Sequence, residues 1–481
     1  MHSSIDPSDW GLAPAAITAG RGGDLAALLE IKRILVEQFG IPEGFAVYRQ
    51  ALNLPDSDHL RLRPLRGIRE FAVEQGILFH ELAPAGEHFT MAPPLVIGEG
   101  NHRTLEGVGR SSFVACLPEA RVRGSSSFIN IEDAALLDYE GEELTRFDDR
   151  MTFDPAVFCV VDDRELWMIE PERETRSIQI DEAFTLLGTH TVAFGHWMWE
   201  YLPKYLVASM SGLLPAVPVL IDRDMPGTHR QALELMLPRG VQIIELAPFV
   251  TAQVRRLWYA PSQMHMPVRA KLNERAKWDY LGSPPSRFSP IFREMGRRVE
   301  AAMSPAAVEP SERVFLSRRK QGVRKMVNRE AIEAAAEARS FRVVSAEDLT
   351  FAHQASLLRQ ARFVVGPEGS AMALLFFAKP GTKALILQHR YTAGSPVLAS
   401  LLREVGIDVT LMTGPYARVD EAYAHFSDYE IDPLGFSRFL DDELKLARPE
   451  ISADRLRAST GMLPWLRAAF RLSTPTSRQC K

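Results

Sequence analysis

Residues 362–387, RFVVGPEGSAMALLFFAKPGTKALIL, decide the predicted fold of this chain. A β-branched run leads into the turn GPEGS at residues 366–370, and a short apolar helix is expected to open directly from that turn. A strand that feeds a helix in this way leaves the first backbone N–H groups of the helix unpaired and directed at the crevice beyond the strand. Such a crevice suits a phosphate group, whereas Glu368 within it suits a hydroxyl, such as that of a ribose. The stretch therefore predicts a site for a nucleotide-activated substrate.

The turn also has a purely structural explanation. Ser370 can cap the helix, and Gly369 can supply a backbone angle that other residues avoid. What favours nucleotide contact by Gly366, Glu368, Gly369 and Ser370 is a basic segment earlier in the same half of the chain.

Strands and helices alternate on both sides of this stretch. We predict strands at 314–317, 341–344, 362–366 and 383–388, and helices at 329–339, 351–360 and 370–378. An earlier alternation gives a helix at 194–210 interrupted at Pro203, strands at 217–221, 241–246 and 258–260, and helices at 228–236 and 251–257. Because strands that alternate with helices form parallel sheets, the predicted fold class is α/β with two facing Rossmann-like halves.

The remaining segments divide the chain further. The predicted regions are an N-terminal accessory region at 1–90 with one helix at 24–38, an antiparallel β-rich region at 91–180, a first Rossmann-like domain at 181–300, a second at 310–420, and a C-terminal helical tail at 421–481. Residues 275–312 are rich in proline and serine and are expected to connect the two halves.

Composition restricts the class of protein. The chain has 481 residues, of which 46% are hydrophobic and 24% charged, and a net charge of −5. These values are typical of a soluble globular protein without the basic field that binds nucleic acid. Three widely spaced cysteines without a CxxC motif favour a reducing cytosol over a disulfide framework. We expect a cytoplasmic protein without a secretory signal or membrane span.

The C-terminal tail mixes arginines with large apolar residues between 444 and 472. This pattern is typical of a last helix that docks on its own domain with a solvated arginine face. It also fits an interfacial helix on an anionic membrane, which would make the protein peripheral at the inner face of that membrane.

A basic segment follows the predicted strand at 314–317. It carries Ser317, Arg318, Arg319, Lys320, Arg324 and Lys325. Side chains just beyond the carboxyl end of a parallel strand face the ligand crevice of an open α/β sheet. Arginine grips phosphate with a planar fork and lysine adds point charge, so the segment can neutralise a nucleoside diphosphate without a metal ion. The alternative is a solvated charged loop, and Asn328 is expected to cap the next helix.

A possible general base lies in the first half, within FGHWMWEYLPKYL at 194–206. His196 and Glu200 are four residues apart and share one face of a helix, where the carboxylate can raise the basicity of the imidazole. The structural alternative is that His196 is a buried hydrogen-bonding residue among aromatic side chains. Asp222 and Asp224 follow another predicted strand and form a D-x-D pattern that suits Mn²⁺ or Mg²⁺. The same two aspartates fit a simple turn and helix start, which we favour.

In this order, the segments resemble the glycosyltransferase family 61 proteins, many of them capsular polysaccharide biosynthesis proteins. The resemblance covers about residues 100–415 and rests on FVACLPEARVRGSSSFI, FGHWMWEYLPKYL, RVFLSRRKQGVRKMVNREAI and FRVVSAEDLTFAHQASLLRQARFVVGPEGSAMALLFF. It implies a GT-B fold, which consists of two facing Rossmann-like domains, and inverting sugar transfer from a nucleotide sugar without an essential metal or other cofactor.

The resemblance also implies roles for individual residues. These are Ser317, Arg318 and Arg324 at the donor diphosphate, the 366–370 turn at the nucleotide, and His196 on the acceptor side. Several family members have His-Gly where this chain has Glu368 and Gly369. The role of that histidine therefore does not carry over to Glu368.

The main hypothesis is an inverting glycosyltransferase that moves a sugar to a hydroxyl of a glycan or lipid-linked glycan acceptor. Its setting would be bacterial capsular or extracellular polysaccharide, or lipopolysaccharide, biosynthesis. One alternative is a metal-dependent glycosyltransferase that uses Asp222 and Asp224. Another is a non-catalytic, glycosyltransferase-like protein that binds nucleotide or glycan.

Overall fold

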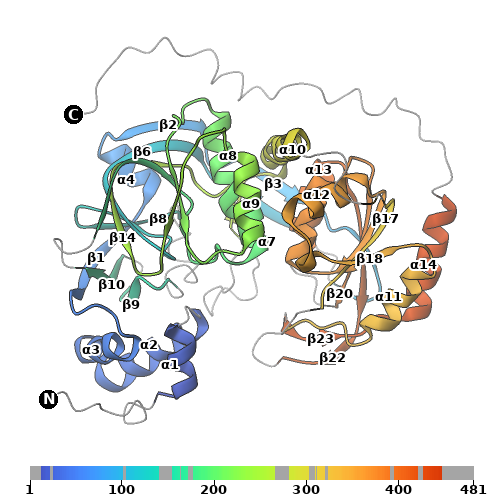
Figure 1. Ribbon diagram of the computed structural model, residues 1–481, viewed down its shortest axis with the longest axis horizontal. Helices are drawn as coiled ribbons and strands as arrows, with labels where there is room; N and C mark the ends of the chain where they lie inside the picture. Colours follow the sequence, from blue (N-terminus) through green and yellow to red (C-terminus); the bar gives the residue numbers. More distant parts are fainter. Residues whose placement is uncertain are drawn as a thin grey trace.

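Two β-sheets lie side by side in this computed structural model, with helices between them (Figure 1). The structure describes residues 12–21, 25–100, 104–139, 154–162, 164–171, 177–265, 281–302, 309, 311–319, 323–390, 395–420 and 426–446. Both sheets contain parallel strands connected through helices, so the predicted α/β fold class is confirmed.

The C-terminal half contains a fully parallel sheet. Its strands are β17 (Arg313–Ser317), β18 (Arg342–Ser345), β19 (Phe363–Pro367), β20 (Lys383–His389), β21 (Asp408–Gly414) and β4 (Leu95–Ile97), in the order β18-β17-β19-β20-β21-β4. Its helical segments are α11 (Arg329–Glu337), η4 (Ala346–Asp348), α12 (Phe351–Gln360), η5 (Ser370–Phe377), α13 (Ser395–Glu404) and α14 (Pro433–Leu446). The chain moves outward from β17 to β18 and then returns to place β19 on the other side of β17. This reversal creates a topological switch point between the carboxyl ends of β17 and β19, where open α/β sheets bind ligands.

The predicted strands and helices of this half are closely confirmed, with one change of helix type. Residues predicted as an α-helix at 370–378 form the 3₁₀-helix η5. Residues 372–377 are all buried, so η5 is enclosed on every side and lacks the one-sided apolar stripe of a surface helix. The narrow 3₁₀ geometry fits this confined position. The sequence also gave no sign that β4, from the N-terminal third, would extend this sheet beside β21.

The larger sheet belongs to the N-terminal half. Its strands are β1 (Asp58–Gly67), β2 (Leu78–Ala83), β6 (Ser112–Arg123), β7 (Ile129–Ile131), β8 (Ala134–Leu137), β9 (Val157–Val160), β10 (Glu165–Pro171), β11 (Ile178–Thr185), β12 (Val219–Asp222), β13 (Ile243–Leu246) and β14 (Thr251–Tyr259). Among the described residues the order is β13-β12-β11-β14-β6-β7-β8-β1-β10-β9, with β2 also paired to β6. The first four strands are parallel, whereas β6–β7, β7–β8 and β9–β10 are antiparallel, as the pattern at 91–180 predicts. Strands β1 and β2 come from the predicted accessory region and are part of this sheet.

Three further strand pairs are short. They are β3 (His88–Met91) with β5 (Leu105–Val108), β15 (Met264–His265) with β16 (Leu281–Gly282), and β22 (Tyr416–Arg418) with β23 (Asp428–Tyr429).

The predicted helix at 251–257 and strand at 258–260 are wrong, because β14 is one continuous strand. Ala252, Val254 and Leu257 are buried on it, and it pairs with both β11 and β6. Only residues 247–250 connect β13 to β14, with no crossover helix. An isolated parallel bridge joins Gly124, at the end of β6, to Pro248, so the sheet curls back on itself. The first half therefore departs from an open Rossmann-like sheet.

The helical segments of the N-terminal half are α1 (Pro14–Arg21), α2 (Leu25–Phe39), α3 (Ile41–Leu52), α4 (Ile68–Glu74), α7 (Phe194–His196), the π-helix η2 (Trp197–Tyr201), α8 (Leu202–Met210), α9 (Gly227–Met236) and α10 (Pro285–Ala302). Helices α7, α8 and α9 lie between this sheet and the C-terminal half (Figure 1). Helix α2 confirms the helix predicted at 24–38. Helices α1 to α3 share a buried cluster with Phe158 and Ile169, so they pack onto β9 and β10.

Helix α14 (Pro433–Leu446) is the last described element of the chain. Helix α14 ends at Leu446, and the tail for which membrane contact is predicted lies almost wholly outside the described residues. Within the described ranges, no helix is long and apolar enough to cross a membrane.

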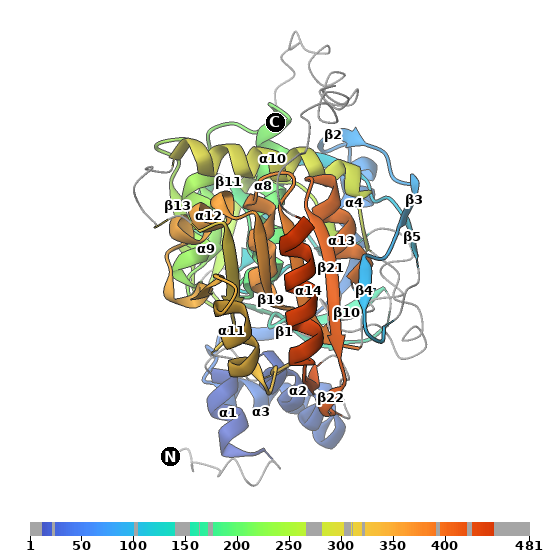
Figure 2. The same cartoon turned by 90° about the vertical axis from the view of Figure 1, so that its right-hand side faces the viewer.

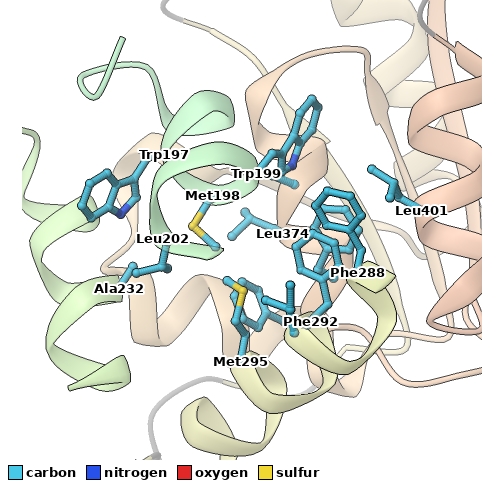
Figure 3. Close-up of a cluster of buried hydrophobic side chains, with 14 of the residues drawn as sticks. Trp197, Met198, Trp199, Leu202, Ala232, Phe288, Phe292, Met295, Leu374 and Leu401 are labelled. Carbon is cyan, nitrogen blue, oxygen red and sulfur yellow. The ribbon is translucent and has the colours of Figure 1, made fainter. Parts of the chain in front are cut away.

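The two halves share one apolar interface. A single buried cluster runs from α8 and α9 through α10 to η5, α12 and α13, and its side chains interdigitate between the halves (Figure 3). Figure 2 shows α10 along one edge of the molecule, where it packs on α8 and α13. Phe292 of α10 and Phe376 of η5 stack with ring centroids 3.7 Å apart and planes at 3°. Burial of large side chains at this contact holds the halves together.

We expect Phe292→Ala to lower the free energy of unfolding by about 3–5 kcal/mol, because it removes a fully buried ring from the shared cluster. Chemical denaturation monitored by circular dichroism measures this loss. Leu434→Ala is the matched control, since Leu434 is 68% exposed and its truncation should change stability by less than about 0.5 kcal/mol. Equal effects of the two substitutions would contradict the assignment of Phe292 to the core.

Candidate functional site

The predicted helix at 194–210 is divided into α7, a π-helical turn and α8. In the π-turn, the backbone N–H of Leu202 bonds to the carbonyl of Trp197, five residues earlier. Pro203 follows and has no N–H to continue an α-helical ladder, so the local widening at this point has a sequence cause. The aromatic residues Trp197, Trp199 and Tyr201 are buried core side chains, as expected.

His196 and Glu200 form the pair that their spacing predicts. The Nδ1 of His196 lies 2.6 Å from Oε1 of Glu200, whose side chain is only 2% exposed. A buried carboxylate at this distance accepts a hydrogen bond from the Nδ1–H group, and in that tautomer Nε2 is the nitrogen that can accept a proton. The His196 side chain is 20% exposed, so it is partly accessible to solvent.

Arg318, Arg324 and Glu368 meet at the switch point between β17 and β19. Arg324 donates to the Glu368 carboxylate with Nη1 and Oε2 2.5 Å apart, and Arg318 donates to the Glu368 carbonyl. Burial, followed by repulsion from Arg324, lowers the pKa of Arg318 to about 10, so its guanidinium remains charged at neutral pH. The Glu368 carboxylate is hydrogen-bonded to Arg324, whereas Arg318 contacts only the Glu368 main chain, so two guanidinium groups of the kind that bind anions lie together here.

The two glycines of the 366–370 turn allow neighbouring protein atoms to pack closely against the turn. A Cβ on Gly369 would lie 2.4 Å from Nη1 of Arg318, so only glycine lets this guanidinium rest on the turn. A Cβ on Gly366 would lie 2.6 Å from the Leu316 carbonyl oxygen, so this glycine serves the packing of β19 on β17. The backbone N–H of Glu368 bonds to Leu387 and is therefore not available to a phosphate.

Two residues of the predicted basic segment have structural partners. The Ser317 hydroxyl donates to Glu333 of α11, so it fixes the helix to the end of β17. Asn328 stands at the N-cap position of α11, but its side chain makes no capping bond there. Instead, its amide donates to the Ile431 carbonyl and its carbonyl accepts from the Ile431 N–H. The prediction that the Asn328 side chain caps α11 is therefore wrong.

The segment that includes β23 supports the basic loop, and sequence reasoning missed it. The N–H of Arg324 bonds to the carbonyl of Phe426, the N–H of Lys325 bonds to the Asp428 carboxylate, and Met326 bridges to Tyr429. Arg324 has a φ of 55°, a strained value for a residue with a side chain, and these bonds hold it there. No local motif at 426–431 marks this role.

Asp222 and Asp224 do not converge. Asp222 is buried and accepts hydrogen bonds from the N–H groups of Ser125 and Gly188 and from the hydroxyl of Thr191, whereas Asp224 is exposed. Burial raises the pKa of Asp222 to about 6. Both oxygens of Asp222 are occupied by the protein, so the residue organises loops, and the two aspartates do not fit a shared metal site. In the described part of the chain, no group of three or more potential ligands is arranged to hold a metal ion.

The two candidate half-sites meet where α7 packs against the start of η5. A Cβ on Gly195 would lie 3.3 Å from the Ser370 hydroxyl oxygen, so the residue before His196 touches the residue after Gly369. Ser370 is exposed and lies at this junction. The chain thus brings the His196–Glu200 pair and the arginine pair to the same boundary between the two halves.

Comparison with known proteins concerns the segment that contains these residues. Residues 194–385 match the model of the family described as Glycosyltransferase 61, from the first residue of α7 to the middle of β20. No curated protein matches the chain. The resemblance to glycosyltransferase family 61 is confirmed over this segment, which contains both His196 and Arg318. The family indicates a glycosyltransferase in general, with a donor and an acceptor substrate.

We expect Asp222→Asn to lower the free energy of unfolding by about 1–3 kcal/mol. The amide nitrogen of asparagine cannot accept the hydrogen bonds that one oxygen of the Asp222 carboxylate accepts. Denaturant titration measures this loss, and EDTA should leave wild-type activity unchanged. Loss of all activity in EDTA, with full recovery on adding Mn²⁺, would contradict the loop-organising role of Asp222.

The effect of Asp222 on stability also depends on pH. Its folded pKa, raised to about 6, exceeds the unfolded value of 3.8. The stabilisation from Asp222 is therefore fully present below about pH 3.8 and is lost as the pH rises through about 6. The difference in unfolding free energy between wild type and Asp222→Asn should shrink from pH 4 to pH 7. A difference that grows over this range would contradict the raised pKa.

Proposed function

We propose that the chain is an inverting glycosyltransferase of GT-B type that transfers a sugar from a nucleotide sugar to a hydroxyl of a glycan or lipid-linked glycan. The observation that supports this most strongly is the contact between Gly195 and Ser370, which joins an acid–base pair to an anion site across the boundary of two α/β halves. The N-terminal half alone contributes the His196–Glu200 pair, and the C-terminal half alone contributes the two arginines. Together they offer the two functions that sugar transfer needs.

The donor side binds the nucleoside diphosphate. Arg318 and Arg324 lie at the switch point, where phosphate oxygens can accept from both guanidinium groups. As the bond between the anomeric carbon and the phosphate oxygen breaks, its electron pair goes to the diphosphate. The two arginines stabilise that growing charge without a metal ion. Ser317 acts only indirectly, since its hydroxyl is bonded to Glu333.

The acceptor side removes a proton. Nε2 of His196 takes the proton of the acceptor hydroxyl while that oxygen attacks the anomeric carbon from the face opposite the diphosphate, which inverts the configuration. Glu200 accepts a hydrogen bond from Nδ1 and stabilises the imidazolium that results. The buried position of Glu200 strengthens this interaction, because little water competes for the carboxylate.

Glu368 serves as an internal counter-ion for the arginines. Its carboxylate accepts a hydrogen bond from Arg324. A diphosphate competes for the same guanidinium, so donor binding releases the Glu368 side chain, which can then accept from a ribose or sugar hydroxyl of the donor. Gly369 and Ser370 lie beside this nucleotide, and Gly366 supports the turn.

The biological setting follows from the family resemblance. We place the reaction in the biosynthesis of bacterial capsular or extracellular polysaccharide, or of lipopolysaccharide, on the cytoplasmic side of the membrane. Peripheral membrane contact through the tail beyond α14 remains part of this proposal, and that segment lies outside the described residues.

Arg318→Ala and His196→Ala should separate binding from chemistry. Each lost charge-assisted contact to phosphate costs about 1.5–3 kcal/mol, so Arg318→Ala should weaken nucleotide binding by roughly 10- to 150-fold. His196→Ala should leave that affinity unchanged and lower kcat by a factor on the order of 100 to 10,000. Calorimetry with UDP, GDP and CMP and their sugars, and transfer assays in EDTA, measure the two effects.

Binding of a nucleotide without transfer to any glycan acceptor would favour the non-catalytic alternative. Absence of both binding and turnover for every nucleotide sugar would contradict the proposed function altogether. Arg362→Ala is the matched control for Arg318→Ala, since Arg362 is an exposed arginine at the opposite end of β19.

Glu368→Gln should tighten the binding of inorganic pyrophosphate, because the anion no longer competes with an internal carboxylate for Arg324. We expect a gain of about 3- to 10-fold, in keeping with the net strength of a partly exposed ion pair. Calorimetric titration with pyrophosphate in wild type and variant measures it. Weaker binding by the variant would show that Glu368 positions Arg324 instead of competing for it.

A further inference from the structure

The ring of His190 contacts the ring of His196. His190 belongs to the loop at 186–193 between β11 and α7, and its ring centroid is 4.9 Å from that of His196, with the ring planes at 31°. His190 also precedes the segment that matches the family model, which begins at residue 194.

Two buried carboxylates clamp the loop that carries His190. Asp154 accepts from the N–H of Ser127 and from the hydroxyl of Thr189, with distances of 2.7 and 3.0 Å. Asp222 holds the same loop at the residues on either side, Gly188 and Thr191. The residues on both sides of His190 therefore donate to buried carboxylates, and the backbone around His190 has little freedom to move.

The clamp is itself anchored in the N-terminal helices. Lys32 of α2 is buried and donates from Nζ to the carbonyl oxygens of Asp154 and Val157. Burial raises the pKa of the Asp154 carboxyl, and the neighbouring Lys32 charge acts in the opposite direction. A buried group that is fixed at both its carbonyl and its carboxylate is a rigid support.

The loop also fits closely against the π-turn. A Cβ on Gly188 would lie 2.2 Å from the Tyr201 hydroxyl oxygen, and the His190 N–H lies 3.5 Å from that same hydroxyl. Tyr201 is the last residue of the turn that contains Glu200. The ring contact with His190 and the hydrogen bond to Glu200 therefore both tie His196 to the same closely packed group of residues.

We propose that His190 is a positioning residue for His196. The Glu200 bond sets which nitrogen carries the proton only while the His196 ring keeps its orientation, and a single hydrogen bond lets the ring pivot out of line with the carboxylate. The His190 ring, which contacts the His196 ring, limits that motion, so that Nε2 keeps its direction toward the acceptor. This inference rests on the proposed function, because it assigns His196 as the general base.

Three substitutions test the role of the ring face. His190→Phe keeps a flat ring without ionisable nitrogens, His190→Ala removes the face, and His80→Ala is the control, since His80 is exposed on β2. We expect His190→Ala to lower kcat by on the order of 10- to 100-fold, as misplacement of a catalytic group does, with donor affinity unchanged. His190→Phe should recover most of kcat, and His80→Ala should match wild type.

The second measurement does not need activity. Long-range ¹H–¹⁵N spectra of histidine-labelled protein report the tautomer of His196, with the assignment made by loss of its signals in His196→Ala. Wild type and His190→Phe should show one dominant Nδ1–H form, and His190→Ala should show a mixture. If His190→Phe is as inactive as His190→Ala, or if His190→Ala retains a single tautomer, the positioning role is wrong. A wild type with the expected tautomer but no transfer would instead contradict the proposed function alone.

Discussion

The contact between α7 and the start of η5 is the constraint on which the candidate site depends. Gly195 has no side chain, and a Cβ there would lie within 3.3 Å of the Ser370 hydroxyl oxygen. This closeness puts His196, one residue later, at the boundary reached by the turn that supports Arg318. Neither half holds a complete site without it. The shared apolar cluster behind the contact, with Phe292 stacked on Phe376, fixes the boundary in place.

The polar groups of the site are tolerated because each is paired within a rigid frame. Glu200 is buried but accepts from His196, and the Arg324–Glu368 pair is held by backbone bonds from the segment at 426–431. Unpaired buried charge would cost several kcal/mol, so the frame and the pairing had to arise together. The same logic explains Asp222, which is a buried carboxylate with three donors and not an open metal ligand.

Much of this could be predicted from sequence, because the signals involved are local. The strands and helices of the C-terminal half follow from hydrophobic periodicity, and the His196–Glu200 pair follows from helical spacing. The signals that failed are of two kinds. Thr251 to Tyr259 mixes apolar and charged residues in a pattern compatible with either a helix or a strand, and only its pairing with β6 and β11 decides.

The second kind of failure concerns partners far apart in the chain. β4 joins β21 across more than three hundred residues, and Asn328 bonds to Ile431 with no motif at either end. The ion pair of Arg324 with Glu368 could not be predicted either. Both residues are predicted to bind the donor, but the sequence does not show which side chains contact each other. The bridge between Gly124 and Pro248 in the first sheet likewise joins residues far apart in the chain.

The central claim is that the two halves form one site at the Gly195–Ser370 contact. A crystal structure with a bound nucleoside diphosphate tests it most directly. We predict that phosphate oxygens contact Arg318 and Arg324, that Glu368 has left Arg324, and that His196 faces the terminal phosphate. A nucleotide bound away from these arginines, or one whose terminal phosphate points away from His196, would contradict the account.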